Sequence, residues 1–141
     1  MKQELVQDWM TRDVITIAPE TSLKEAHDIM KKKSIRRLPV VFHGKVLGIV
    51  TLGDIRGAEP SKASSLSVWE MNDLLANLKI SEIMTRDPAT IQQTANIGEA
   101  AQIMLEKKFS GLPVVDGENH LVGIITESDI FRLVVSEWTK T

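Results

Sequence analysis

The sequence predicts a mixed α/β (α+β) protein made of two tandem β-α-β-β-α repeats that pack together with pseudo-twofold symmetry. Three observations predict this class. The stretches "MTRD" and "LPVV" each occur twice at an offset of 74 residues, and "GIVTLGDI" returns as "GIITESDI" at an offset of 75. Both copies show the same order of apolar runs and amphipathic helices. One copy of about 50 residues is too small to bury a sufficient core, so we expect the copies to pack together.

The first repeat is expected to occupy residues 1–56. Its β-branched run "VITI" predicts a short strand, and Ser22 with Glu25 has the spacing of a helix-capping box. The helix that follows gathers four apolar residues on one face: Leu23, Ala26, Ile29 and Met30. "LPVV" predicts the next strand and "HGK" a turn. The nearly all-apolar "VLGIV" predicts a strand buried on both faces, with a helix beginning near Asp54.

The second repeat, expected over residues 80–141, has the same pattern. "ATI" predicts a short strand, and Asn96 with Glu99 is expected to cap a helix. The apolar stripe of that helix consists of Ile97, Ala100, Ala101 and Met104. "LPVV" and "LVGII" predict two further strands around the turn "DGEN", and a last helix begins near Asp129. The single extra residue of this copy falls in the glycine-containing turn, where a hairpin tolerates an insertion.

Residues 57–79 are expected to form a linker and a helix. The first half is rich in Gly, Pro and Ser and is typical of a linker. In the second half, four apolar residues recur at helical spacing: Val68, Met71, Leu75 and Leu78. This stripe is expected to pack against the repeats, and a partner-binding helix is the alternative interpretation.

Composition excludes several function classes. The 141 residues carry 17 basic and 19 acidic side chains, a formal net charge of -2, which gives no basic patch for nucleic acid or anionic membranes. No apolar run approaches the roughly 18 residues of a membrane span, and the N-terminus lacks the apolar core of a signal peptide. The chain has no cysteine, which fits a reducing compartment. We expect a cytoplasmic protein without a nucleic-acid or membrane partner.

The duplicated phrase contains the motif T-x-x-D, at Thr51 and Asp54 and again at Thr126 and Asp129. This is the spacing of a helix-capping box, in which the hydroxyl and the carboxylate each accept a hydrogen bond from a backbone N–H. Capping alone explains the repetition. A helix N-terminus also offers free N–H groups to a phosphate, so both interpretations stay open.

The order h-x-x-h-M-T, short strand, amphipathic helix, "RRLPVV" or "SGLPVV", and G-[IV]-[IV]-T-x-x-D-I resembles a tandem pair of CBS domains, the Bateman module. The resemblance covers nearly the whole chain. The linker "SLSVWEMNDLLANLKISEIM" is similar to that of acetoin-utilisation CBS proteins. Such proteins often carry a C-terminal ACT domain, which we do not expect in a chain that ends at Thr141.

The resemblance implies nucleotide clefts between the repeats, in which the motif Asp accepts from ribose hydroxyls and the Thr lies beside ribose or phosphate. The opposite repeat would hold the adenine through its first strand and the residues before "LPVV". One cleft would combine Ile15, Thr16, Ile35, Arg36 and Arg37 with Thr126 and Asp129. The other would combine Ala89, Thr90, Phe109, Ser110 and Gly111 with Thr51 and Asp54. A carboxylate suits a cis-diol because it accepts two hydrogen bonds at once.

Four arginines are candidates for binding a ligand phosphate: Arg36, Arg37, Arg56 and Arg132. For each, a solvated or ion-paired position on the surface is the alternative. The three histidines occur singly, so no metal site is expected. Motifs for a nucleophile, a Walker loop or a dinucleotide fold are lacking, so we expect no enzyme.

Two functions remain. The favoured one is a regulatory module that binds AMP, ADP, ATP or S-adenosylmethionine as a regulatory ligand and transmits occupancy to an unknown protein partner. The alternative is a ligand-independent dimerisation or interaction platform, with Trp69 or Trp138 providing contact surface. In either case the apolar helical faces and the resemblance predict a homodimer.

Overall fold

The computed structural model describes residues 4–60 and 65–140 and divides into two compact units. The N-terminal unit is Ile15–Pro88, and the C-terminal unit combines Met1–Val14 with Ala89–Thr141. The leading segment of each sequence repeat therefore belongs to the unit of the other repeat. Val6 lies in the core of the C-terminal unit, whereas Ile80 lies in the core of the N-terminal unit.

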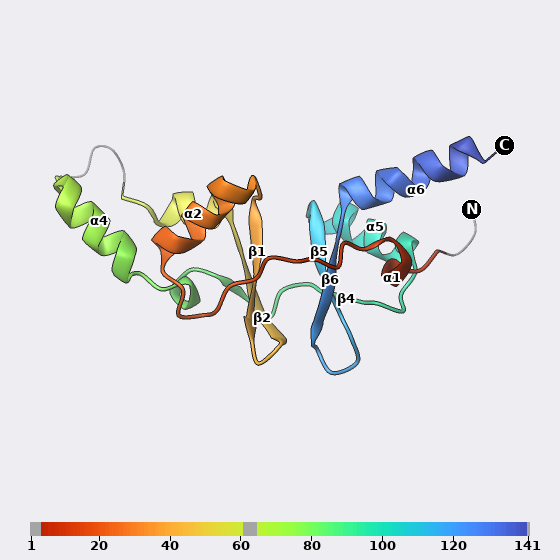
Figure 1. Ribbon diagram of the computed structural model, residues 1–141, viewed down its shortest axis with the longest axis horizontal. Helices are drawn as coiled ribbons and strands as arrows, with labels where there is room; N and C mark the ends of the chain where they lie inside the picture. The colour runs from red at the N-terminus through yellow and green to blue at the C-terminus, as the bar shows by residue number, and fades with distance from the viewer. Residues whose placement is uncertain (1–3, 61–64, 141) are drawn as a thin grey trace. The chain divides into compact units, whose positions relative to one another are not determined.

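The N-terminal unit contains a three-stranded antiparallel sheet in the order β1-β2-β3, with its helices on one face (Figure 1). The strands are β1 Arg37–Phe42, β2 Lys45–Thr51 and β3 Thr85–Arg86. The helices are α2 Leu23–Lys33, α3 Leu52–Ala58, α4 Val68–Asn77 and the 3-10 helix η1 Ile80–Glu82. Residues 61–64, in the predicted linker, lie outside the described part of the chain.

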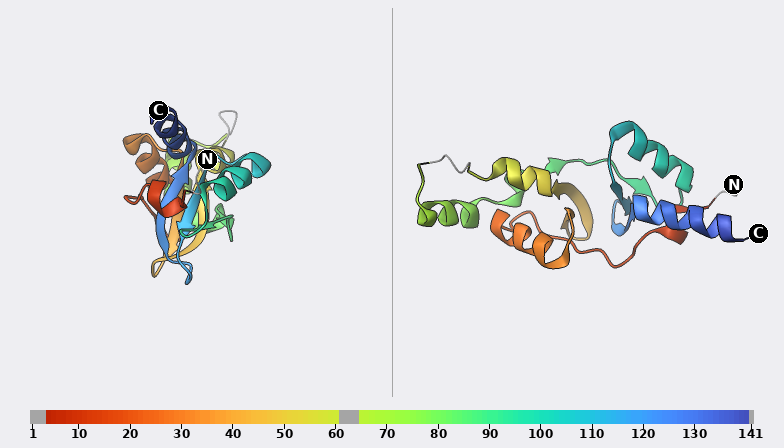
Figure 2. Two further views of the ribbon diagram at one scale, coloured as in Figure 1. Left: turned by 90° about the vertical axis from the view of Figure 1, so that its right-hand side faces the viewer. Right: turned by 90° about the horizontal axis from the view of Figure 1, so that it is seen from above.

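The C-terminal unit has a sheet in the order β4-β5-β6, in which β4 runs parallel and β6 antiparallel to β5. Two long helices, α5 and α6, lie on one face of this sheet (Figures 1 and 2). The elements are α1 Val6–Trp9, β4 Ile91–Gln92, α5 Ile97–Lys107, β5 Gly111–Val115, β6 Leu121–Thr126 and α6 Glu127–Thr139. The predicted α+β class with two repeated modules is confirmed.

The predicted helix caps and apolar stripes are confirmed. Ser22 Oγ accepts from the backbone N–H of Glu25 at 3.1 Å, and Asn96 Oδ1 accepts from that of Glu99 at 2.9 Å. These bonds satisfy N–H groups that the first helical turn leaves without a partner. Three residues of each stripe are buried: Leu23, Ala26 and Met30 on α2, and Ile97, Ala100 and Met104 on α5.

The prediction of a strand at "VITI" was wrong. Only Ile17 pairs, through a single parallel bridge to Val40, and in the second repeat β4 begins at Ile91. Residues 12–16, where the chain passes from the C-terminal to the N-terminal unit, form no bridge to a described strand, whereas Thr11 before them pairs with Ile124. A turn at Pro19 ends the pairing beyond Ile17.

The expectation that "VLGIV" and "LVGII" are buried on both faces was also wrong. Along β2, buried Val46 and Val50 alternate with Leu47, which is 37% exposed, and half-buried Ile49. In β6, Ile125 is buried while its neighbours are half-buried. The helices of each unit cover one face of its sheet, so alternate side chains stay accessible to solvent.

The helix predicted in the linker region exists as α4, but only its C-terminal end packs. Leu75 and Leu78 contact the core of the N-terminal unit. Figure 1 shows this end of α4 beside α2, with the other end pointing away. Val68 is 73% and Trp69 84% exposed, so packing against the repeats is wrong for the first turn of the helix.

A glycine lets each exchanged leading segment approach its sheet closely. In the C-terminal unit, a Cβ on Gly123 would lie 2.7 Å from Met10 Sδ and 2.8 Å from the carbonyl oxygen of Thr11. Thr11 exchanges two backbone hydrogen bonds with Ile124, of 2.8 and 2.9 Å. Gly48 stands in the same relation to Met84 and Thr85 in the N-terminal unit. These contacts bring the "MT" dipeptide of one repeat beside the T-x-x-D strand of the other.

Candidate functional site

The T-x-x-D motif of the N-terminal unit lies where β2 ends and α3 begins. Thr51 Oγ1 accepts from the backbone N–H of Asp54 at 3.1 Å, and Asp54 Oδ2 accepts from that of Thr51 at 2.9 Å. The predicted capping box is therefore present. Asp54 is half-buried, and among the contacts of the described residues none engages its Oδ1. This oxygen is free to accept a hydrogen bond from a ligand.

The motif of the C-terminal unit has the same capping box at the start of α6, with more partners. Asp129 Oδ2 accepts from the backbone N–H of Thr126 at 2.8 Å and from its hydroxyl at 3.1 Å. Oδ1 accepts from the Thr11 hydroxyl at 3.3 Å and from Nη2 of Arg132. Asp129 is 1% exposed, and among the described residues it is the one charged side chain that is buried.

The sequence did not identify Thr11 or the partner of Arg132. Thr11 belongs to the repeated "MTRD", and this repetition singles out its position in the sequence. Because Thr11 and Asp129 lie far apart in the chain, no local pattern predicts their contact. Arg132 lies three residues after Asp129, a spacing at which helical side chains meet. Arg132 occupies an ion-paired position on the surface, which was the alternative to phosphate binding. Arg56 is exposed and forms no ion pair with a described residue.

Within the N-terminal unit, two of the residues predicted from the first repeat, Arg36 and Arg37, lie beside the T-x-x-D motif. Arg37 pairs with Thr51 across the β1–β2 ladder, and the carbonyl oxygen of Arg36 accepts from the N–H of Leu52 at 2.8 Å. Ile15 and Ile35 are half-buried against the core, whereas Thr16 is exposed.

The C-terminal unit repeats this arrangement. Gly111 pairs with Thr126 across β5 and β6, and the carbonyl oxygen of Ser110 accepts from the N–H of Glu127 at 3.1 Å. Phe109 is 43% exposed, Ala89 packs against the core and Thr90 is half-buried. Each unit therefore places the two residues before its own "LPVV" beside its own motif. The predicted pairing with the opposite repeat remains a prediction.

The family model for the CBS domain matches residues 6–61 and 80–136, which contain both capping-box motifs. The chain belongs to the CBS domain family. Curated relatives include the uncharacterized protein MJ1225 of Methanocaldococcus jannaschii, 33% identical over 93% of this chain and 47% of its own length. The chain spans less than half the length of the first such relatives it matches.

Solved structures of CBS pairs share this fold along nearly the whole chain. The CBS domain pair of protein MJ0100, in complex with 5-methylthioadenosine and S-adenosyl-L-methionine, is 36% identical with a TM-score of 0.76, covering 96% of this chain and 99% of that one. CBSX2 of Arabidopsis thaliana in complex with AMP is 26% identical with a TM-score of 0.81, covering 96% and 98%. A protein assigned to acetoin utilization (AcuB) from Vibrio cholerae is 31% identical with a TM-score of 0.79, covering 97% and 94%.

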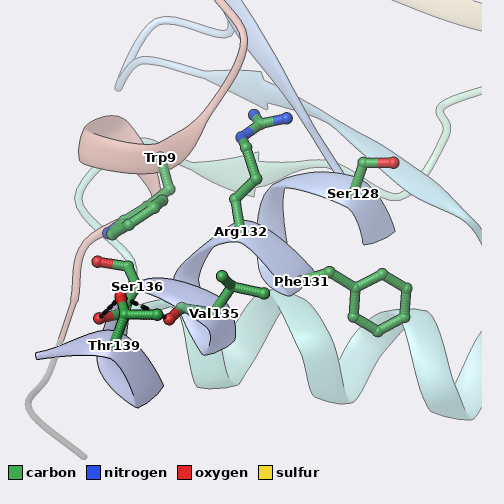
Figure 3. Close-up of a pocket in the computed structure, with 7 residues that line it drawn as sticks. All are labelled: Trp9, Ser128, Phe131, Arg132, Val135, Ser136 and Thr139. Atoms are coloured by element: carbon green, nitrogen blue, oxygen red, sulfur yellow. Dashed lines mark hydrogen bonds between the residues drawn. The ribbon is translucent and has the colours of Figure 1, made fainter. Parts of the chain in front are cut away.

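Outside the motifs, this CBS pair has an open hollow of about 680 Å³ on its C-terminal unit (Figure 3). It lies along α6 beside Trp9 of α1. The lining residues are Trp9, Ser128, Phe131, Arg132, Val135, Ser136 and Thr139. Phe131, Val135 and Trp138 on the same helix are 65%, 61% and 79% exposed. The C-terminal helix thus leaves an apolar face uncovered.

Two of the three histidines of this CBS pair, His27 and His120, lie beside carboxylates. His27 Nδ1 lies 2.9 Å from Glu59, and His120 Nδ1 lies 3.3 Å from Asp116. Backbone N–H groups of His120 and Glu118 hold the pKa of Asp116 below its ordinary value. Residues 4–60 and 65–140 contain no group of three or more His, Asp or Glu side chains suited to a metal ion, and no helix in these ranges is long and apolar enough to cross a membrane.

Proposed function

We propose that this CBS pair is a non-catalytic regulatory module that binds an adenine nucleotide or another adenosyl ligand through its two T-x-x-D motifs. The observation that carries the proposal is the half-buried carboxylate of Asp54, held by its capping bond with Oδ1 left open to a ribose diol. The ligands of the MJ0100 pair and of CBSX2, which all contain adenosine, support the ligand class.

The residues predicted for each site from the sequence remain the candidates for the other ligand groups. Ile35 and Phe109 offer apolar surface to a base, and Thr51 and Thr126 lie beside the ribose-binding carboxylates. Arg36 is exposed beside the first motif and is available to a phosphate.

Isothermal titration calorimetry with AMP, ADP, ATP and S-adenosylmethionine tests the proposal. We expect at least one of them to bind with a Kd on the order of micromolar, about -8 kcal/mol. The same ligand is expected to raise the melting temperature, because it binds the folded state alone. Absence of heat and of a thermal shift for all four at millimolar concentration would reject the proposal and favour a ligand-independent interaction platform.

We further propose that the protein is a homodimer, in which a second copy covers the exposed face of α6. Phe131, Val135 and Trp138 follow helical spacing and are all more than half exposed. An apolar stripe of this size on one helix is typical of a surface that associates. The apolar first turn of α4 is a second candidate surface for a protein partner.

Light scattering at tens of micromolar tests the dimer. We expect twice the mass of one 15.7 kDa chain, and we expect Val135→Glu with Trp138→Glu to produce a monomer by placing unpaired charges in the interface. Leu105→Glu, at an 81% exposed position of α5, is the matched control and is expected to keep the dimer. A wild-type monomer, or a dimer that survives the α6 substitutions, contradicts this assignment.

A further inference from the structure

The two T-x-x-D carboxylates have different hydrogen-bond partners although their motifs match. A carboxylate offers about four lone-pair positions. Asp129 receives four hydrogen bonds: two from Thr126, one from Thr11 and one from Arg132. Among the described residues, only Thr51 donates to Asp54. The acceptor positions that a ribose would use are therefore occupied at Asp129 and open at Asp54.

A sequence difference accounts for the extra guanidinium. At the offset of 75 residues that aligns Asp54 with Asp129, Arg132 corresponds to Gly57. The arginine of the first repeat, Arg56, corresponds to Phe131. It follows Asp54 by two residues, a spacing at which helical side chains do not face each other. The C-terminal unit therefore carries its own cation beside its motif carboxylate, at a place where the N-terminal unit has no side chain.

A ligand that reaches Asp129 must exchange with this cation. The Asp129 carboxylate is 1% exposed, so its oxygens are not satisfied by bulk water, whereas the Arg132 side chain is 60% exposed. A ribose hydroxyl that replaces Arg132 at Oδ1 leaves the guanidinium to water or to the ligand. A phosphate offers it a charge-assisted pair, and a neutral nucleoside offers nothing of that kind.

We propose, on the basis of the proposed function, that Arg132 is a specificity-determining residue of the Asp129 site. Its guanidinium competes with the ribose of every ligand for Oδ1 of Asp129. Only a ligand with an anionic group offsets this cost, because that group forms a charge-assisted pair with the displaced guanidinium. The Asp129 site therefore selects phosphorylated adenosyl ligands against neutral ones.

The test compares the binding of AMP and adenosine to the full chain by calorimetry. The chain carries Asp54→Asn, which removes the charge of the other motif carboxylate. The Asn side chain still offers an oxygen acceptor to the Thr51 N–H. We expect the preference for AMP over adenosine to fall about fivefold on Arg132→Met, mainly because adenosine binds more tightly. Arg132→Lys keeps the charge and is expected to keep most of the preference. Lys107→Met, which removes an exposed charge from α5 of the same unit, is expected to leave the preference unchanged.

An unchanged preference in Arg132→Met, or an equal fall in Lys107→Met, overturns the role of Arg132. Binding by wild type combined with no binding in Asp54→Asn, with or without Arg132→Met, also overturns it and leaves the proposed function standing. A wild-type chain that binds none of AMP, ADP, ATP and S-adenosylmethionine rejects the proposed function, and this inference falls with it.

Discussion

Replacing Asp129 by alanine is expected to lower the free energy of unfolding by about 3 kcal/mol, because three hydrogen bonds lose their shared acceptor at once. The substitution removes the acceptor of the Thr126 backbone N–H, of the Thr126 hydroxyl and of the Thr11 hydroxyl. Loss of the pair with Arg132 adds little, since that side chain is 60% exposed. Urea unfolding of the ligand-free protein, followed by circular dichroism, measures the change.

Asp54→Ala is the matched comparison, at the corresponding position of the other repeat. It removes a single capping hydrogen bond from a half-buried site and is expected to cost about 1 kcal/mol. Equal losses in the two variants would contradict the unequal bonding of the two carboxylates. A smaller loss for Asp129→Ala than for Asp54→Ala would contradict it as well.

The sequence predicted the capping roles of both motifs because a capping box is local: its donors and acceptors lie three residues apart. Thr51 and Asp54 form the predicted box, as do Thr126 and Asp129. The contact between Thr11 and Asp129 joins residues far apart in the chain, so no local pattern predicts it. The difference between the two sites therefore became visible only in three dimensions.

The repeats were predicted correctly from periodicity, but the exchange of their leading segments was not. "VQDWM" and "KISEIM" precede their repeats in sequence, and each packs in the unit of the other repeat. Both segments carry the same apolar spacing and the same Met-Thr, so either would suit either sheet by composition. Chain connectivity alone does not decide which sheet each segment joins.

Gly123→Ala is expected to destabilise the protein by about 2 kcal/mol through overpacking. The new methyl group would lie 2.7 Å from Met10 Sδ, which can move, and 2.8 Å from the Thr11 carbonyl oxygen, which is backbone and holds Ile124. The leading segment must shift away from β6, and the hydrogen bonds between Thr11 and Ile124 lengthen or break. Thermal and urea unfolding measure the loss.

Gly117→Ala is the control in the same unit, because a Cβ there has no atom within 4 Å. We expect it to change the free energy of unfolding by less than about 0.5 kcal/mol. Hydrogen exchange at the Thr11 and Ile124 amides separates local from global effects: Gly123→Ala is expected to lose protection there first. Full protection at both amides in Gly123→Ala would show that the segment does not depend on this glycine.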